Sequence, residues 1–327
     1  MKTVKSILAV LTLMLIIAPI ASAEKKYPSK PITMVVGYGV GGSSDRMTRA
    51  MTSFISEEMG QPVKVVNKKG AATLLGLNYV LKRPADGYTI YSGAVSPYMG
   101  AHVMTGKAKF SMDDWAIINI QWPDYTLYAA SKDSPYKTME DFLKAVKENP
   151  GKVSAAAMQN SVGLLTLKLI LKEAGIPEKN LNLVTYTSGG KARSAVAGGS
   201  VDLIAIAAEG CLGIKEYLVP LAIGRNEADE SWNAPAINES LKPLGITVPV
   251  LSDAARGYAV PTKMKKDHPE RYEKLVTALK KVTENGDVKK FLKGSNIGSE
   301  WIGPEAATEV VKETAAAFME HKEILTQ

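Results

Sequence analysis

The stretch from residue 31 to residue 49 reads Pro-Ile-Thr-Met-Val-Val-Gly-Tyr-Gly-Val-Gly-Gly-Ser-Ser-Asp-Arg-Met-Thr-Arg. Its apolar run from Ile32 to Val36 predicts a short buried strand. A glycine-rich loop follows, and after Ser43 a set of apolar residues recurs at helical spacing: Met47, Ala50, Met51, Phe54, Ile55 and Met59. The first turn of a helix leaves backbone N–H groups unpaired at its positive end. A strand, a glycine loop and a helix in this order therefore predict an anion site.

The rest of the chain alternates between strand and helix patterns, which favours an α/β fold with a mostly parallel sheet. The expected strands cover residues 32–36, 63–66, 88–92, 115–120, 125–130, 153–158, 181–186, 201–207 and 218–223. After the first helix, the expected helices cover residues 72–81, 139–147, 164–174, 191–197, 269–284, 287–293 and 304–325. Thr138 is expected to cap the helix at 139–147, because Asp141 stands three residues further on.

A second loop of small residues, Thr187-Ser188-Gly189-Gly190, also follows a predicted strand and precedes a predicted helix. The two halves of the chain thus suggest two α/β lobes that present helix N-termini to a shared cleft, where pockets often lie. The C-terminal helices are expected to close a discontinuous first lobe, which gives two linkers and a hinge. We predict residues 27–128 and 254–327 for the first lobe and residues 129–253 for the second.

The loops after the strands supply the candidate ligand-binding residues, because open α/β sheets bind ligands at the carboxyl ends of their strands. These candidates are Tyr38, Gly39, Gly41, Gly42, Ser43, Ser44, Asp45, Ala94, Ser96, Gln159, Ser161, Thr187, Ser188, Gly189, Gly190 and Glu209. Tyr38 stands inside the glycine loop and is the aromatic residue most expected to contact a ligand. Asp45 either stabilises its own helix N-terminus or organises the glycine loop. Lys191 and Arg193 either add charge for an anion or are solvated.

The motif Gly37-x-Gly39-x-x-Gly42 fits the dinucleotide fingerprint, but its context argues against that function. The second strand ends at Asn67 followed by Lys68, where a dinucleotide site needs an acidic residue for the ribose. Asp45 would stand in the first helical turn and repel a pyrophosphate. A Walker loop is absent, since Gly-Lys-Ser/Thr does not occur. We therefore expect no nucleotide cofactor.

The sequence also gives little sign of catalysis or of a metal site. No Gly-x-Ser-x-Gly motif occurs, and nothing marks a histidine partner for the loop serines. The histidines His102, His268 and His321 are far apart, and no His-Glu-x-x-His motif, paired cysteines or calcium loop is present. We expect a binding protein without catalytic residues, metal or cofactor. An exported α/β hydrolase-like enzyme is the alternative.

The N-terminus predicts export. Lys2 and Lys5 precede an apolar run from Ile7 to Ile20, and Ala21-Ser22-Ala23 forms a small-x-small cleavage signal. This pattern is typical of a cleavable signal peptide over residues 1–23, and the apolar run is short for a membrane span. We therefore expect the mature chain in the periplasm.

The mature chain is expected to be mildly basic. The sequence has 40 basic residues, two of them in the predicted signal peptide, against 33 acidic ones. The lysines are scattered and do not interleave with aromatic residues, so we expect no nucleic-acid partner. A mild positive field favours anionic ligands. The single cysteine, Cys211, excludes an internal disulfide.

Several motifs taken together resemble the extracytoplasmic solute receptors of the tripartite tricarboxylate transporters, also called Bug proteins. The specific matches are Tyr27-Pro28-Ser29-Lys30-Pro31-Ile32, Gly41-Gly42-Ser43-Ser44-Asp45 with Arg49, Gly60-Gln61-Pro62-Val63, Asn67, Gly70-Ala71 and Ala85-Asp86-Gly87-Tyr88-Thr89. Weaker matches are Gly189-Gly190, Ala195, Gly199-x-Val201-Asp202 and Tyr258-Ala259-Val260-Pro261. The resemblance covers essentially the whole mature chain.

This resemblance implies a two-lobed periplasmic binding protein of type II that closes like a Venus flytrap. It implies a carboxylate ligand, such as a di- or tricarboxylate, an amino acid or an aromatic acid, held by backbone amides and ordered water in loops 38–45 and 187–190. It further implies delivery to a membrane permease with a large and a small subunit. We expect a monomer. A ligand-presenting partner of a sensor, without transport, is the alternative.

The chain departs from the family pattern in the loops expected to hold the ligand. Gly37-Tyr38-Gly39-Val40 stands where the family usually has Pro-Phe-x-Pro. Thr73 stands where a second glycine pair is common, and Thr185-Tyr186-Thr187-Ser188-Gly189 replaces the usual Pro-Tyr-Lys-Gly. The identity of the ligand is therefore not transferred from the family.

Overall fold

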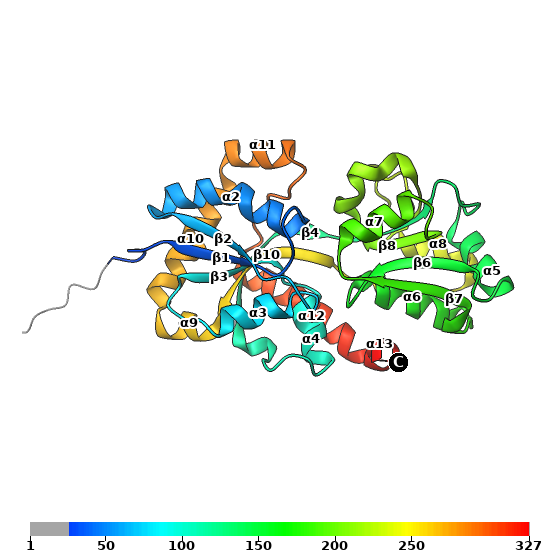
Figure 1. Cartoon of the computed structure of the whole chain (residues 1–327), viewed down its shortest axis with the longest axis horizontal. Coiled ribbons are helices and arrows are strands. Elements are labelled where there is room, and N and C mark those ends of the chain that lie inside the picture. Colours follow the sequence, from blue (N-terminus) through cyan, green and yellow to red (C-terminus); the bar gives the residue numbers. More distant parts are fainter. Residues whose placement is uncertain (1–25, 327) are drawn as a thin grey trace, which may run out of the picture.

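Two α/β lobes lie side by side, each built on its own five-stranded sheet (Figure 1). The computed structural model describes residues 26–326, and the predicted signal peptide lies outside the described residues. The strands are β1 (Ile32–Val36), β2 (Val63–Asn67), β3 (Thr89–Ala94), β4 (Trp115–Asp124), β5 (Thr126–Ser131), β6 (Val153–Met158), β7 (Leu181–Tyr186), β8 (Leu203–Ala207), β9 (Leu218–Ile223) and β10 (Asp253–Pro261). Their order is β2-β1-β3-β10-β4 and β7-β6-β8-β5-β9. The two-lobed α/β fold predicted from the sequence is confirmed.

Helices cover the sheets and bury their faces. In the first lobe, one apolar cluster joins the sheet to α2, α10 and α11, and another joins its opposite face to α3, α4 and α12. The helices are α2 (Ser43–Met59), α3 (Leu74–Leu81), α4 (Tyr98–Met104), α5 (Met139–Glu148), α6 (Val162–Glu173), α7 (Gly189–Ala197), α8 (Ile237–Leu241), α9 (Thr262–Asp267), α10 (Pro269–Glu284), α11 (Gly286–Gly294), α12 (Gly303–Glu320) and α13 (Lys322–Thr326). The 3-10 helices are η1 (Met112–Asp114), η2 (Glu178–Asn180), η3 (Ala208–Tyr217) and η4 (Lys242–Leu244). None of the helices between residues 26 and 326 has the length and apolar character to cross a membrane.

The sheets are mixed, whereas the sequence predicted mostly parallel pairing. β1 pairs in parallel with β2 and β3, and β6 pairs in parallel with β7 and β8. β5 and β10 run antiparallel to both of their neighbours. Each of these two strands receives the chain after it has crossed from the other lobe. The crossing reverses the direction in which the chain enters the sheet, and the strand pairs accordingly.

Strand β10 has no counterpart in the sequence-based prediction, although all nine of its residues are buried. Polar Asp253 and Arg256, together with Gly257, interrupt the apolar pattern that would have marked it. Gly257 is required by the packing, since a Cβ there would lie 1.8 Å from the backbone oxygen of Asn119 in β4. Helix α4 was likewise not predicted.

Helix α3 begins at Leu74, two residues after the predicted start at residue 72. Ala71, Ala72 and Thr73 have positive φ values of 45°, 46° and 83°, which residues with a side chain rarely adopt. An α-helix needs negative φ values, so α3 can begin only after Thr73. His102 Nε2 donates a hydrogen bond of 2.7 Å to the Ala72 carbonyl and helps to hold the turn. By contrast, the predicted Thr138–Asp141 capping box on α5 is confirmed.

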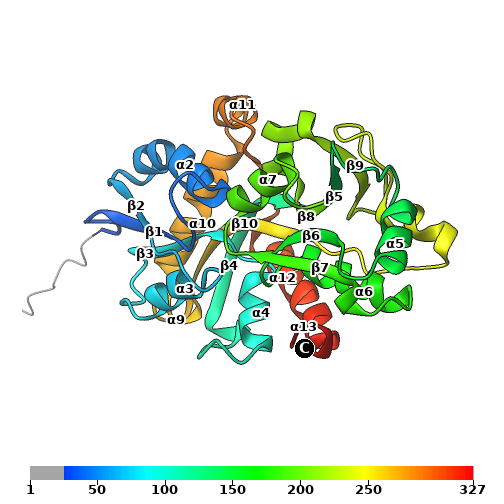
Figure 2. The same ribbon diagram turned by 45° about the vertical axis from the view of Figure 1, so that its right-hand side comes forward.

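Three connections join the lobes. The chain passes from β4 to β5 through Tyr125 and returns into β10 after Ser252. The third connection is formed by the C-terminal helices: α12 packs on β4 and α4 of the first lobe, and α13, which follows it, packs on α6 of the second lobe (Figures 1 and 2). Phe318 of α12 is buried in an apolar cluster that combines Ala101 and Met104 of α4 with the core of the second lobe, and Lys168 Nζ on α6 donates a hydrogen bond of 3.0 Å to the Ile324 carbonyl. The division at residues 128/129 and 253/254 stays a prediction.

Candidate functional site

A cavity of about 540 Å³ opens where loops from both lobes meet. Among the residues predicted from the sequence, those that line it are Tyr38, Gly39, Gly42, Ser43, Ser44, Ala94, Thr187, Ser188, Gly189 and Gly190. The structure thus brings the two small-residue loops, which are about 150 positions apart in the sequence, to one site. Their role in binding a ligand stays a prediction.

The first-lobe side of the cavity is the N-terminus of α2. The N-cap residue is Gly42, which has no side chain to satisfy the first turn. Within the described part of the chain, the N–H groups of Ser43, Ser44 and Asp45 donate no hydrogen bond. The end of this 17-residue helix therefore offers unpaired donors and the positive pole of the helix dipole to the cavity.

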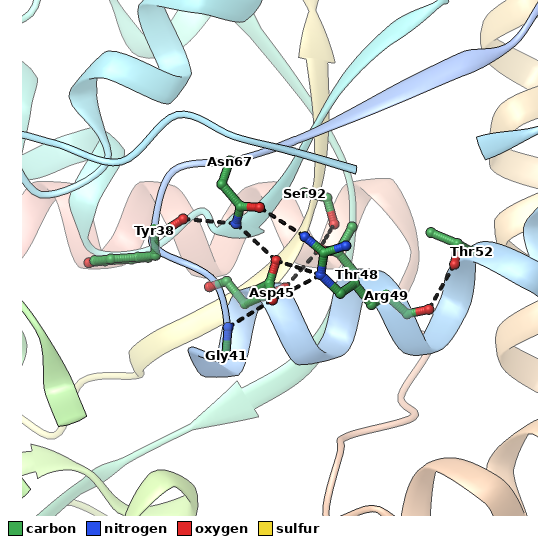
Figure 3. A network of polar contacts seen from close by, with 9 residues as sticks. Tyr38, Gly41, Asp45, Thr48, Arg49, Thr52, Asn67 and Ser92 are labelled. Carbon is green, nitrogen blue, oxygen red and sulfur yellow. Dashed lines mark hydrogen bonds and ion pairs between the residues drawn. The ribbon is translucent and has the colours of Figure 1, made fainter. Parts of the chain in front are cut away.

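Asp45 holds the glycine loop through hydrogen bonds and lies outside the cavity lining (Figure 3). Its buried carboxylate accepts hydrogen bonds from the Gly41 N–H at 2.9 Å, from Arg49 Nε at 3.0 Å and from Asn67 Nδ2 at 2.9 Å. Asn67 Nδ2 also donates to the Tyr38 carbonyl at 3.0 Å, so both ends of the loop are fixed. This geometry matches the loop-organising interpretation, and Asp45 does not line the cavity. Gly41 suits the loop because its φ is 82°.

The balance of forces on Asp45 keeps it charged. Burial by itself would raise the pKa of this carboxyl group. Hydrogen bonds from Arg49, from the Gly41 N–H and from Asn67 outweigh burial and hold the pKa of Asp45 below its ordinary value. The negative charge of Asp45 is therefore compensated by the groups that donate hydrogen bonds to it. The N-terminus of α2 remains positive on the side that faces the cavity.

The second-lobe side of the cavity is the N-terminus of α7. Ser188 is its N-cap but makes no side-chain capping hydrogen bond. The first turn consists of Gly189, Gly190 and Lys191 and contains no acidic residue. Two helix N-termini, one from each lobe, therefore line the same cavity.

Two tyrosines form one wall. The rings of Tyr38 and Tyr98 meet edge to face, with 5.8 Å between their centroids. The buried Tyr38 hydroxyl has no hydrogen-bond partner of good geometry within residues 26–326. Burial raises the pKa of both Tyr38 and Tyr98, so both phenols stay protonated and can donate a hydrogen bond.

Several lining residues were not among the sequence-based candidates. They are Gly37, Val40, Lys69, Gly70, Ala71, Ala72, Thr73, Tyr98, Met158, Ile206, Ala207, Gly210, Ala254 and Arg256. Lys191 and Arg193, for which the sequence left a charged role or solvation open, also line the cavity. No composition signal marks the turn at residues 70–73, whose unusual backbone brings it to the cavity.

The lining is cationic. It contains Lys69, Lys191, Arg193 and Arg256 and no carboxylate. Arg256 is already paired, since its Nη1 lies 2.9 Å from Asp124 Oδ2 and both side chains are buried. The guanidinium of Arg256 also lies 4.5 Å from the centre of the Trp122 ring. The net field in the cavity favours an anion.

The remaining candidates lie away from this cavity, and so do Gly41 and Asp45. The Ser161 hydroxyl caps α6 by accepting a hydrogen bond of 3.2 Å from the Leu164 N–H. Ser96 is buried, and the Gln159 N–H is bonded to the chain in β7. Glu209 lines a second cavity of about 640 Å³ beside the hinge, and burial raises its pKa. Their role as ligand contacts stays a prediction.

The chemistry of the cavity suits binding. Its hydroxyl groups stand on loops and in the first turns of α2 and α4, and its lining contains no histidine that could act as a base. Among the described residues, no group of three or more His, Cys, Asp or Glu side chains is placed to hold a metal ion. Unpaired amides, phenols and cations remain, and these are donors for an anionic ligand.

Comparison with known sequences places this chain in a family. Residues 47–316 match the profile described as tripartite tricarboxylate transporter family receptor. A protein of Cupriavidus necator, described as the UPF0065 protein in the gbd 5' region, is 30% identical over 188 residues. The match covers 57% of this chain and 56% of that protein. The aligned part of the chain thus spans little more than half the length of this curated relative.

Solved structures share the fold. One protein of Rhodopseudomonas palustris, solved with adipate, has a TM-score of 0.77 at 19% identity, covering 92% of this chain and 98% of that one. MatC from Rhodopseudomonas palustris, solved with bound malate, has a TM-score of 0.75 at 21% identity, covering 90% and 100%. The members of the matched family are transporter receptors, which are binding proteins and not enzymes. Because the family profile matches most of the sequence, the chain belongs to the tripartite tricarboxylate transporter receptor family.

Proposed function

We propose that this protein is a periplasmic receptor that captures a small organic carboxylate in the cavity between its lobes. The ligand is a di- or tricarboxylate or an aromatic acid, and a membrane permease with a large and a small subunit receives it from a monomeric receptor. One observation carries the proposal: two helix N-termini with unpaired donors meet at a cavity whose lining is cationic and holds no carboxylate.

Helix electrostatics support an anionic ligand. Each helix N-terminus carries roughly half a positive charge, and an anion there gains about 0.3–1 kcal/mol at exposed sites and up to ~2 kcal/mol where partly buried. A ligand that touches both lobes favours the closed arrangement by its differential affinity for that arrangement. A carboxylate can accept several such hydrogen bonds at once, which a neutral sugar or an amine cannot do equally well.

The similar proteins support the choice of a carboxylate among anions. The two Rhodopseudomonas palustris proteins were solved with malate and adipate, both of which carry two carboxylates. The loops around Tyr38 and Thr187 differ from the family pattern, so a ligand panel should reach beyond these two acids. Tyr38 and Tyr98 offer a wall on which an aromatic acid could pack.

Thermal unfolding of the mature chain tests the proposal. The panel comprises malate, adipate, citrate, glutamate and benzoate, with glucose and putrescine as neutral and cationic controls. A carboxylate at about 100 times its Kd should add ~2.7 kcal/mol to the free energy of unfolding. Stabilisation by the sugar or the amine, with none by any carboxylate, would contradict the anion site.

A variant at the α2 N-terminus tests the location of the site. Gly42 has ordinary extended φ and ψ values of −70° and 165°, so the backbone tolerates a side chain. We expect Gly42→Val to abolish carboxylate binding with little effect on unfolding, because its methyl groups cover the open amides. Gly213→Val is the matched control, since a Cβ at Gly213 meets open space. Unchanged affinity in Gly42→Val would remove this helix end from the site.

Two further experiments test the periplasmic location of the protein and the delivery of its ligand to a permease. Receptors of this family are periplasmic, and the predicted signal peptide supports the same location for this chain. Osmotic shock of cells that express the full-length chain should release the mature protein, whereas a chain that lacks residues 2–23 should stay in the cytoplasm. Uptake of the bound carboxylate should require both the receptor and the permease. A signalling response that persists without a permease would favour the sensor alternative.

A further inference from the structure

We propose that Arg193 contacts, from the second lobe, the same ligand carboxylate that the α2 N-terminus binds from the first, so that one carboxylate bridges the lobes. The inference rests on the proposed function, since it takes the ligand to be a carboxylate. It makes Arg193 the residue through which the second lobe recognises the charge of the ligand.

Two glycines leave room for the Arg193 guanidinium. Arg193 lies four residues after Gly189 on α7, so its side chain leans back toward the helix N-terminus. Arg193 Nη1 lies 3.0 Å from the position that a Cβ on Gly189 would take and 2.7 Å from that of a Cβ on Gly210. A side chain at position 210 would therefore force the guanidinium to move.

The guanidinium also faces the first lobe. The Cβ position at Gly210 is 3.8 Å from Ser43 Oγ and 2.7 Å from Arg193 Nη1. The distance between Ser43 Oγ and Arg193 Nη1 therefore cannot exceed the sum of 3.8 Å and 2.7 Å. A carboxylate that accepts hydrogen bonds of ordinary length, about 2.8 Å, on each of its two oxygens can span such a gap. Arg193 and Ser43 both line the cavity.

Arg193 lacks a counter-ion within residues 26–326. Asp124, the carboxylate that acts on Arg193 electrostatically, is already paired with Arg256. Burial lowers the pKa of Arg193, and the charge of Arg256 acts in the same direction, so the protonated guanidinium gains from an added anion. A half-buried cation without a partner is costly, and a ligand carboxylate would relieve that cost.

This arrangement differs from binding by helix ends alone. Helix N-termini and phenols can also serve a neutral carboxamide, because its oxygen accepts hydrogen bonds. A guanidinium gains most from an ionised acceptor, with which it forms charge-assisted hydrogen bonds. Arg193 should therefore account for much of the preference for a carboxylate over the matching amide.

Isothermal titration of the mature protein tests the proposal with adipate, its monocarboxylate analogue hexanoate, and hexanamide. For Arg193→Gln we expect about 10- to 100-fold weaker binding of both acids, the range of one lost hydrogen bond to a charged group. The preference for hexanoate over hexanamide should fall by a similar factor. Lys172→Gln removes the same charge from an exposed position at the end of α6, outside the cavity lining, and should change each Kd by less than about threefold.

A second variant moves the guanidinium without removing it. Gly210→Ala should weaken adipate and hexanoate binding, because its Cβ would collide with Arg193 Nη1 at the end of a flexible side chain. Its unfolding temperature should stay near that of the wild type. Gly213→Ala, in the same 3-10 helix and with open space around its Cβ, should bind like the wild type.

The possible outcomes separate this inference from the proposed function. If the wild type binds neither these acids nor any other carboxylate of the panel, the proposed function fails and the inference fails with it. If the wild type binds a carboxylate and Arg193→Gln binds it equally well, only the inference fails. If the loss is confined to adipate, Arg193 contacts a second carboxylate instead, and the bridging arrangement is overturned.

Discussion

The two loops that line the cavity differ in how firmly the protein holds them. In the first lobe, Asp45 and Asn67 fix the glycine loop at Gly41 and at the Tyr38 carbonyl (Figure 3). In the second lobe, Thr187 and Ser188 are exposed, and α7 begins without a side-chain cap. Side-chain hydrogen bonds therefore hold the first loop in one conformation, whereas among residues 26–326 none holds Thr187 or Ser188 in the second.

The largest expected effect comes from Asp45→Ala. This change leaves the Gly41 N–H and the Asn67 amide without their acceptor, while Arg49 is 47% exposed and can be solvated. We expect the free energy of unfolding, measured by urea denaturation, to fall by about 2–4 kcal/mol. The matched change in the other loop, Ser188→Ala, should cost less than about 0.5 kcal/mol. Equal losses in the two variants would remove the contrast between the loops.

Acid should weaken the first loop through the same residue. Burial opposes ionisation of Asp45, but its hydrogen bonds lower its pKa below the ordinary value of 3.8. The folded pKa lies below the unfolded one, so the stabilisation is complete above about pH 4 and is lost as the pH falls through the folded value. The difference in unfolding free energy between wild type and Asp45→Asn should be constant from about pH 7 to pH 5 and should shrink below about pH 4. A difference that grows on acidification would contradict the network.

The smallest effect in this series compares one glycine from each loop. Gly41 has a φ of 82° and open space around its Cβ position, so Gly41→Ala meets only backbone strain. We expect a loss of about 1 kcal/mol of stability. Gly190→Ala lies in the first turn of α7, where its Cβ meets only Ser188 Oγ at an ordinary 3.7 Å, and it should be neutral or slightly stabilising. Denaturant midpoints of the two variants measure the contrast.

Local patterns were enough to predict much of the fold. The strands at Val153–Met158, Leu181–Tyr186 and Leu218–Ile223 begin and end at the predicted residues, because each is an apolar run between clear turn signals. β10 could not be recognised in this way. Its Arg256 is satisfied by Asp124, which lies 132 residues earlier in the chain, and only the assembled sheet reveals that pairing.

Part of the candidate site could likewise be predicted from local patterns. The two glycine loops could be recognised, because a strand followed by small residues and a helix is a local pattern. The turn at Ala71–Thr73 could not be recognised in this way, since Ala and Thr do not favour positive φ and the hydrogen bond to the Ala72 carbonyl comes from His102, 30 residues later in the chain. The cationic character of the cavity is equally non-local. It depends on which carboxylates are already paired, as Asp124 is with Arg256.

The C-terminal helices add a contact between the lobes that is remote from the cavity. The chain itself crosses between the lobes at Tyr125 and at Ser252. Helix α12 packs on β4 and α4 of the first lobe, and α13 packs on α6 of the second lobe, where Lys168 Nζ donates a hydrogen bond to the Ile324 carbonyl. A change in the angle between the lobes would have to displace α13 from α6. Residues that do not line the cavity therefore contribute to the free-energy difference between arrangements of the two lobes.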